Sequence, residues 1–221
     1  MKESKKWICV FCGSAVGARA EFAAAADNLG RAIAERGYGL VFGGGSIGLM
    51  GVAADAALDA GAEVFGVIPD LIMDCEVGHN GLTELCVVRS MHERKALMAE
   101  RSDAFIALPG GFGTMDEFME IVTWAQLGIH SKPCVLVNVA GYYDPLLRFL
   151  ESAVEDGFIR PENRGLIQVA QNPAEAMRII ECAWRSSEEV SPHDERMDEL
   201  TGYAASGDRN RMMCRRARLT P

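Results

Sequence analysis

Residues 38–69, YGLVFGGGSIGLMGVAADAALDAGAEVFGVIP, decide the expected fold, because they hold one complete strand, helix and strand unit. Residues 38–43 and 63–69 are short apolar runs bounded by glycine or charge, which is typical of strands buried on both faces. Residues 48–60 between them have the periodicity of a helix. Such a unit predicts two parallel strands joined by a helical crossover.

The same alternation continues on both sides of this unit. We expect further strands at residues 6–14, 85–89, 104–108, 134–139 and 166–170, and further helices at residues 21–36, 91–101, 114–127, 142–156 and 173–186. The sequence therefore predicts one α/β domain over residues 1–186, with a single doubly wound, Rossmann-like parallel sheet and helices on both faces. Residues 187–221 are polar, with five arginines after Asp208, and are expected to form a mobile tail.

Composition and charge narrow the class of function. The chain has 221 residues, of which 49% are apolar, and this is enough for a sizeable core. No apolar run approaches the roughly 20 residues of a membrane span, and the N-terminus lacks the long apolar region of an export signal. The formal net charge of −9 argues against a general binder of nucleic acid or anionic membrane. We therefore expect a cytoplasmic protein that acts on a small molecule.

The seven cysteines do not have the pattern of a disulfide framework or a metal site. Cys9 and Cys12 match C-x-x-C, but in a strand they are expected to point to opposite faces. His92 and Glu93 begin like the zinc motif H-E-x-x-H, yet position 96 is alanine. No metal site is predicted.

Glycine-rich turns follow the first two predicted strands. Ser14 lies in the first turn, and in the second Gly43, Gly45 and Gly48 form a G-x-G-x-x-G pattern that also includes Gly44. Such turns can present backbone N–H groups to a phosphate or a ribose, but close packing of a helix explains the same glycines. The fingerprint of dinucleotide-binding proteins follows the first strand of the sheet, so this pattern alone is a weak indication of NAD.

Residues 109–117, PGGFGTMDE, form a third turn, after the strand predicted at residues 104–108. Gly110, Gly111 and Gly113 let the backbone approach a ligand closely, and Thr114 is expected to cap the helix that follows. A phosphate at this helix start would meet free N–H groups and the positive end of the helix dipole. Glu117 has two interpretations, since it is a candidate for catalysis and also completes a capping box with Thr114.

Two cations precede this turn in the sequence. Arg94 and Lys95 lie in the first turn of the helix predicted at residues 91–101, where a solvated charge pair is the ordinary explanation. Asp116 is likewise explained as a favourable charge in the first turn of a helix. Because the glycine turns share one edge of the sheet, we favour a binding role, in which arginine offers a planar fork to an anion and lysine a point charge.

These motifs resemble the LONELY GUY (LOG) family of cytokinin riboside 5′-monophosphate phosphoribohydrolases. The similarity covers residues 7–158 and includes GGGSIGLMG (43–51), SMHERK (90–95), PGGFGTMDE (109–117) and TWAQLG (123–128), in that order. This sequence departs from the family pattern at Phe112, where tyrosine is common, and at Met115 and Asp116, where leucine and glutamate are common. The resemblance implies a doubly wound homodimer that cleaves the bond between ribose 5-phosphate and adenine or an N6-modified adenine.

The resemblance also implies roles for individual residues. Arg94 and Glu117 match the catalytic pair, and a carboxylate suits a reaction that develops positive charge on a ribose. No metal or organic cofactor is implied. The expected substrate contacts include the residues of the glycine turns. They are Ser14, Gly43, Gly44, Gly45, Glu76, Lys95, Gly110, Gly111, Phe112, Gly113, Thr114, Asp116 and Thr123.

Three other functions compete with nucleotide hydrolysis. Proteins that resemble this fold carry the molybdenum cofactor, the G-x-G-x-x-G pattern suggests an NAD-dependent dehydrogenase, and similar sequences have been labelled lysine decarboxylases. A carrier has no need for Arg94 with Glu117, and neither Lys95 nor Lys132 lies in a pyridoxal phosphate motif. A non-catalytic carrier of a nucleotide or of the molybdenum cofactor is the main alternative.

Overall fold

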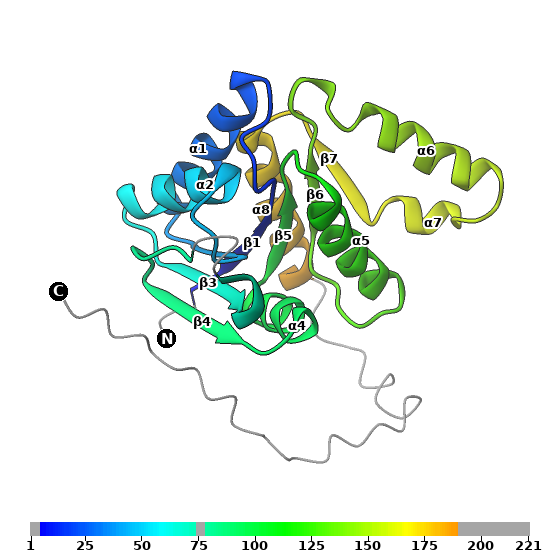
Figure 1. Cartoon of the computed structure of the whole chain (residues 1–221). Coiled ribbons are helices and arrows are strands. Elements are labelled where there is room, and N and C mark those ends of the chain that lie inside the picture. The colour runs from blue at the N-terminus through cyan, green and yellow to red at the C-terminus, as the bar shows by residue number, and fades with distance from the viewer. Residues whose placement is uncertain (1–4, 74–77, 190–221) are drawn as a thin grey trace, which may run out of the picture.

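The computed structural model describes residues 5–73 and 78–189 (Figure 1). Within these residues, seven parallel strands form one sheet in the order β4-β3-β2-β1-β5-β6-β7. The strands are β1 (Trp7–Phe11), β2 (Gly39–Phe42), β3 (Val64–Pro69), β4 (Glu84–Val88), β5 (Ala104–Ala107), β6 (Cys134–Val137) and β7 (Ile167–Ala170).

Helices cover both faces of the sheet. In Figure 1, α1, α2 and α8 lie on one side of the strands and α4 and α5 on the other, while α6 and α7 extend beyond β7. The helices are α1 (Ala20–Glu35), α2 (Gly48–Asp59), α4 (Met91–Arg101), α5 (Phe112–Gln126), α6 (Asp144–Glu155), α7 (Pro161–Arg164) and α8 (Pro173–Glu189), with 3-10 turns η1 (Asp70–Ile72) and η2 (Val139–Gly141).

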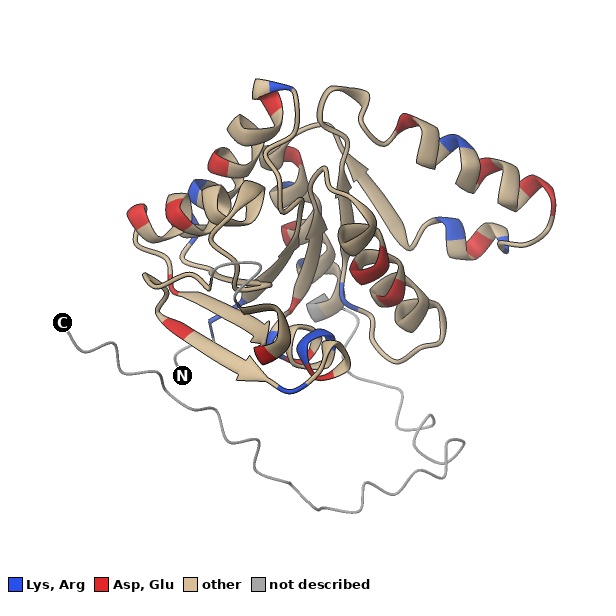
Figure 2. Ribbon diagram, in the orientation of Figure 1, with Lys and Arg blue, Asp and Glu red and all other residues tan. Residues whose placement is uncertain are grey.

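Two hydrophobic cores form because successive strand residues face opposite sides of the sheet. Ile8 and Val10 of β1 pack with α1, α2 and α8, whereas Cys9 and Phe11 pack with α4 and α5. Cys12 belongs to the first core, so the expectation that the two thiols of C-x-x-C face opposite sides is confirmed. Charged residues lie mainly on the helices, and β1, β2 and β5 contain none (Figure 2).

The chain changes direction across the sheet between β1 and β5. Strands β2, β3 and β4 are added on one side of β1, and the chain then returns to place β5, β6 and β7 on its other side. Gly13 N–H, just after β1, donates to Pro109 O, just after β5, at 3.0 Å. In doubly wound sheets, ligands bind beyond the carboxyl ends of the strands at this switch point.

The predicted α/β fold is confirmed, and all seven expected strands are present among the described residues. The first strand ends at Phe11 rather than near Ser14, since Gly13 turns to meet Pro109. The short helix α7 was not predicted, and α8 continues to Glu189. The remainder of the predicted tail, residues 190–221, lies outside the described residues. No helix in the described ranges is long and apolar enough to cross a bilayer.

Candidate active site

Helix α5 begins at Phe112, with Gly111 as its N-cap and with no described side chain capping it. The expectation that Thr114 caps this helix is therefore wrong, because Thr114 is already inside the first turn and is buried. Its hydroxyl packs against Gly110, where a Cβ atom would collide with it. Glu117 lies one turn further along the helix, so the capping-box interpretation of this carboxylate is excluded.

The glycines at this helix start leave space open. A Cβ atom added at Gly111 or Gly113 would meet nothing within 4 Å among the described residues, and neither glycine has a positive φ. Packing and backbone conformation therefore do not require glycine at these two positions. The first N–H groups of α5 have no partner within the helix and carry the positive end of its dipole. This arrangement suits an anion that approaches the backbone closely.

A cavity of about 300 Å³ opens at the start of α5. Arg94 from α4 and Glu117 from α5 both line it. The structure therefore brings the two residues of the predicted catalytic pair to one place. The rest of the lining comes from the turn after β1 and from α2, η1, α4 and α5, and consists of Cys12, Gly13, Ser14, Met50, Ile72, Met91, Gly111, Phe112, Gly113, Thr114 and Asp116.

The guanidinium of Arg94 is held in a buried position. The Arg94 residue is only 3% exposed, and its Nη2 donates to Gly43 O at 3.0 Å. A Cβ atom at position 43 would collide with this guanidinium. The first turn of α4 is itself fixed, because Ser90 Oγ accepts from Glu93 N at 3.2 Å and the Glu93 carboxylate accepts from Arg89 N at 2.8 Å.

The charge of Glu117 acts on the end of β1. Burial and then the nearby Glu117 carboxylate raise the pKa of the Cys12 thiol far above its ordinary value. Burial and then Glu117 also raise the pKa of Cys9, while the charge of Arg94 opposes this in part. Cys12 lines the cavity but stays protonated, so it does not act as a nucleophile there.

Comparison with known proteins agrees with the motifs in the cavity. The sequence model of a family described as "Possible lysine decarboxylase" matches residues 50–180. The chain is 51% identical over 197 residues to the probable cytokinin riboside 5′-monophosphate phosphoribohydrolase LOGL1 of Oryza sativa subsp. japonica, covering 89% of this chain and 88% of the relative. It is 49% identical over 182 residues to the cytokinin riboside 5′-monophosphate phosphoribohydrolase LOG5 of Arabidopsis thaliana, covering 82% and 80%.

The chain belongs to the LOG family.

Solved structures support the fold of this LOG family member. The Moco carrier protein of Chlamydomonas reinhardtii superposes with a TM-score of 0.64 at 24% identity, covering 83% of this chain and 99% of that protein. The molybdenum cofactor binding protein of Rippkaea orientalis superposes with a TM-score of 0.63 at 23% identity, covering 82% and 98%. At this level of identity the likeness concerns the fold.

The lysines of this LOG family member do not fit a decarboxylase. Lys95 Nζ lies 3.1 Å from Asp116 and 3.0 Å from Glu120. Burial lowers the pKa of Lys95, but the hydrogen bonds to these two carboxylates outweigh burial and raise it. Lys132 Nζ donates to Ala99 O at 2.8 Å. A lysine that forms a Schiff base needs a neutral amine beside its cofactor, whereas Asp116 and Glu120 favour the charged form of Lys95.

Lys95 joins α4 to α5 through these ion pairs with Asp116 and Glu120. It is not among the described residues that line the cavity, so its expected substrate contact has no support from the geometry. Asp116 does line the cavity. The ion pairs hold together the two helices that carry Arg94 and Glu117.

The glycines after β2 have a packing role. Gly43 makes room for Arg94, Gly44 has a φ of +80°, and Gly45 forms an isolated antiparallel bridge with Gly78. These three residues do not line the described cavity, because β2 lies one strand away from the switch point between β1 and β5. Gly48 packs against the backbone of Ser14. The contacts of Gly43 and Gly48 agree with the close-packing interpretation of this turn, and its contact with a substrate stays a prediction.

Two other expected contacts lie elsewhere. Thr123 is exposed on α5, and its hydroxyl donates to Met119 O at 2.7 Å, within its own helix. Glu76 lies outside the described residues. Conversely, sequence reasoning missed the apolar lining residues Met50, Ile72 and Met91. Met91 had a local signal, since it opens the helix that carries Arg94.

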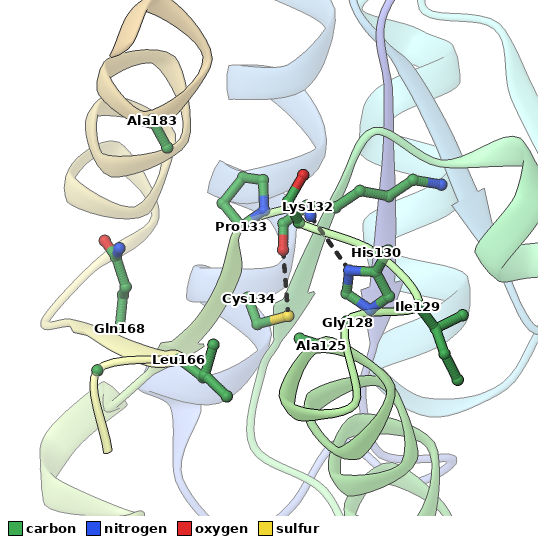
Figure 3. Close-up of a pocket in the computed structure, with 12 residues that line it drawn as sticks. Ala125, Gly128, Ile129, His130, Lys132, Pro133, Cys134, Leu166, Gln168 and Ala183 are labelled. Atoms are coloured by element: carbon green, nitrogen blue, oxygen red, sulfur yellow. Dashed lines mark hydrogen bonds between the residues drawn. The ribbon is translucent and has the colours of Figure 1, made fainter. Parts of the chain in front are cut away.

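Two further cavities differ from this site. One of about 280 Å³ adjoins it, shares Gly13, Ser14 and Gly111 with it, and has Phe22 and Tyr142 in its wall. The other, of about 640 Å³, lies between α5, α8 and the starts of β6 and β7 (Figure 3).

The large cavity in Figure 3 is lined by His130, Lys132 and Cys134, whose side chains are bound to backbone groups. Burial lowers the pKa of His130, whose Nδ1 accepts from Lys132 N at 3.1 Å. Burial raises the pKa of Cys134 to about 12, and its Sγ donates to Lys132 O at 3.5 Å. Both ring nitrogens of His130 are bound by backbone groups, since Nε2 also donates to Ile121 O at 3.0 Å, and the Cys134 thiol is protonated at neutral pH.

Replacing Gly113 with alanine separates stability from ligand binding. Alanine favours the helix, so we expect Gly113→Ala to raise the free energy of unfolding by about 0.5 kcal/mol in urea titrations. The added methyl group occupies the space in front of the helix start, so binding of inorganic phosphate, measured by calorimetry, weakens by roughly tenfold.

Gly165→Ala is the matched control for this change. Gly165 has a φ of −70° at the end of α7, where a Cβ atom would lie 3.8 Å from Glu162 O. This variant is expected to bind phosphate like the unmodified protein. Unchanged phosphate binding in Gly113→Ala contradicts an anion site at the start of α5.

Proposed function

We propose that this chain hydrolyses the N-glycosidic bond of adenine-type nucleoside 5′-monophosphates and releases the free base and ribose 5-phosphate. The observation that carries this proposal is the convergence of Arg94 and Glu117, from two helices, on one cavity at the open start of α5. The LOG relatives, named as phosphoribohydrolases and about 50% identical over most of the chain, support the substrate class.

The 5′-phosphate is assigned to the start of α5. There the N–H groups of the first turn and the helix dipole favour a negative charge, and Gly111 and Gly113 leave the backbone accessible. Ser14 lines the same cavity and offers a hydroxyl. The phosphate would anchor the nucleotide with its ribose over the helix that carries Glu117.

Glu117 is the residue that acts on the reacting bond. As the bond between ribose and base breaks, positive charge develops on the ribose, and a carboxylate nearby stabilises this charge. The same carboxylate accepts a hydrogen bond from the water that adds to the ribose carbon. The water gives its hydroxyl to the ribose carbon and its proton to Glu117, and the departing base takes a proton from solvent at a ring nitrogen, so the products are the neutral base and ribose 5-phosphate.

Arg94 provides the positive charge of the site. Its guanidinium is fixed by Gly43 O and lies 3.9 Å from the sulfur of Met91. A fixed cation offsets the negative charges of the phosphate and of Glu117, and a guanidinium suits phosphate oxygens or ribose hydroxyls. The apolar side chains of Met91 and Ile72 in the lining suit a planar base.

A non-catalytic carrier is the weaker proposal. The molybdenum cofactor proteins share the fold at 24% identity, whereas the LOG relatives share about 50%. A carrier that performs no reaction also has no need for the Glu117 carboxylate in the same cavity as the buried Arg94.

Glu117→Gln tests the catalytic role directly. The amide keeps the shape of the side chain but removes its charge, so we expect base release from AMP to fall by roughly 100- to 10,000-fold. Liquid chromatography of free adenine measures turnover, and circular dichroism checks that the fold is retained. Turnover close to that of the unmodified enzyme would show that Glu117 has no catalytic role.

The 5′-phosphate is tested by comparing AMP with adenosine. Because the start of α5 is assigned to the phosphate, we expect kcat/KM for AMP to exceed that for adenosine by roughly 100-fold or more. The same chromatographic assay on both substrates gives this ratio. Comparable values for the two compounds would remove the phosphate site from the proposal.

We also propose that the protein is a homodimer and works in the cytoplasm. Exposed apolar side chains lie just after α5, where Leu127 and Ile129 are 66% and 64% exposed, and on α6, where Phe149 is 66% exposed. The cysteines of the described residues are free thiols, which fits a reducing compartment.

Sedimentation is expected to show twice the mass of one chain, and Phe149→Asp is expected to weaken this dimer. A monomer at micromolar concentration argues against it.

A further inference from the structure

The segment that connects β6 to α6 contacts the turn at residues 109–113, between β5 and α5, and contains one residue with an unusual backbone conformation. Within η2, Ala140 has a φ of +50°, in the left-handed region that residues other than glycine seldom occupy. Such strain persists only where the surrounding contacts maintain it.

Three contacts hold this segment in place. Asn138 Oδ1 accepts from Tyr143 N at 2.7 Å, and Asn138 Nδ2 donates to Asp144 Oδ1 at 2.7 Å. Arg19 Nη1, before α1, donates to Ala140 O at 3.0 Å. The segment is thus fixed from its own ends and from the other side of the switch point.

The fixed segment in turn holds the strand end before α5. Tyr143 OH donates to Leu108 O at 2.6 Å, and Tyr142 OH donates to Gly110 O at 2.6 Å. Between them, Pro109 O accepts from Gly13 N at 3.0 Å. Three successive carbonyl groups are therefore each bound from outside the turn.

The last of these carbonyls controls the N-cap of α5. The carbonyl of Gly110 and the N–H of Gly111 belong to one planar trans peptide and point in opposite directions. With no Cβ atom on either side, no side chain of Gly110 or Gly111 opposes rotation of this peptide. A rotated peptide would turn its carbonyl oxygen, rather than its N–H, toward an anion at the helix start.

Tyr142 does not serve the hydrophobic core as Tyr143 does. Tyr143 is 2% exposed, whereas Tyr142 is 40% exposed and contacts Phe22 edge-on at 5.5 Å between ring centroids. Its ring lines the smaller cavity beside the site, which shares Gly111 with the cavity of Arg94 and Glu117. The contact that Tyr142 makes with the site is its hydroxyl on Gly110.

We propose that Tyr142 is a positioning residue for the 5′-phosphate. Its hydroxyl keeps the Gly110–Gly111 peptide in the orientation that presents the N–H of Gly111 to the phosphate. This role deepens the proposed function and rests on it for the identity of the anion. Tyr142 acts through the peptide and touches neither the ribose nor the base.

Tyr142→Phe removes the hydroxyl and keeps the ring. We expect the Kd of ribose 5-phosphate, measured by calorimetry, to rise by roughly three- to tenfold. The KM for AMP rises by a similar factor, while kcat at saturating AMP changes less, because Arg94 and Glu117 are untouched. The melting temperature is expected to stay close to that of the unmodified protein, since the side chain is partly exposed.

Two other tyrosines provide controls. Tyr38 packs against Trp184 at 5.2 Å between ring centroids and directly precedes β2, at the amino ends of the strands, whereas the site lies beyond their carboxyl ends, so Tyr38→Phe should leave the Kd unchanged. Tyr143→Phe removes a buried hydrogen bond, so it lowers the melting temperature but raises the Kd less than Tyr142→Phe does.

The outcomes separate this proposal from the proposed function. An unchanged Kd in Tyr142→Phe, or an equal rise in Tyr143→Phe, overturns the positioning role. If the unmodified protein binds ribose 5-phosphate and Tyr142→Phe weakens it, but AMP is not cleaved, then the positioning role stands and the proposed reaction falls.

Discussion

The parallel pairing of β1 with β5 is the contact on which the site depends. It places the turn after β1 beside the turn after β5, where Gly13 N–H binds Pro109 O. Every other part of the cavity is added to this junction: α5 starts from it, α4 packs across the same face, and the segment before α6 holds it from outside. A sheet in another order would separate these turns.

Charge at the site is arranged by the backbone as much as by side chains. The guanidinium of Arg94 is buried against a carbonyl, which limits the cost of removing it from water. Lys95, the next residue, is directed to Asp116 and Glu120 on α5. The two adjacent cations therefore have different roles, since Arg94 lines the cavity and Lys95 joins α4 to α5.

Much of the fold and part of the site could be predicted from the sequence. Apolar strands and helical periodicity specified the sheet, because burial on both faces leaves a clear pattern. The convergence of Arg94 and Glu117 followed from motifs at one sheet edge. The start of α5 differs from the expectation, since Thr114 is a residue type that often caps helices, whereas Gly111 occupies the N-cap position. The contacts of Gly43 and Tyr142 could not be foreseen, because they join residues far apart in the chain and leave no local signal.

The fit between Gly43 and Arg94 links two positions that are 51 residues apart. The arginine occupies the volume that any larger residue at position 43 would claim, and the carbonyl of the glycine anchors the arginine. Substitution at one position therefore changes what the other tolerates. Among relatives of this protein, a sequence without arginine at position 94 would no longer require glycine at position 43. The residue types at the two positions are therefore expected to change together.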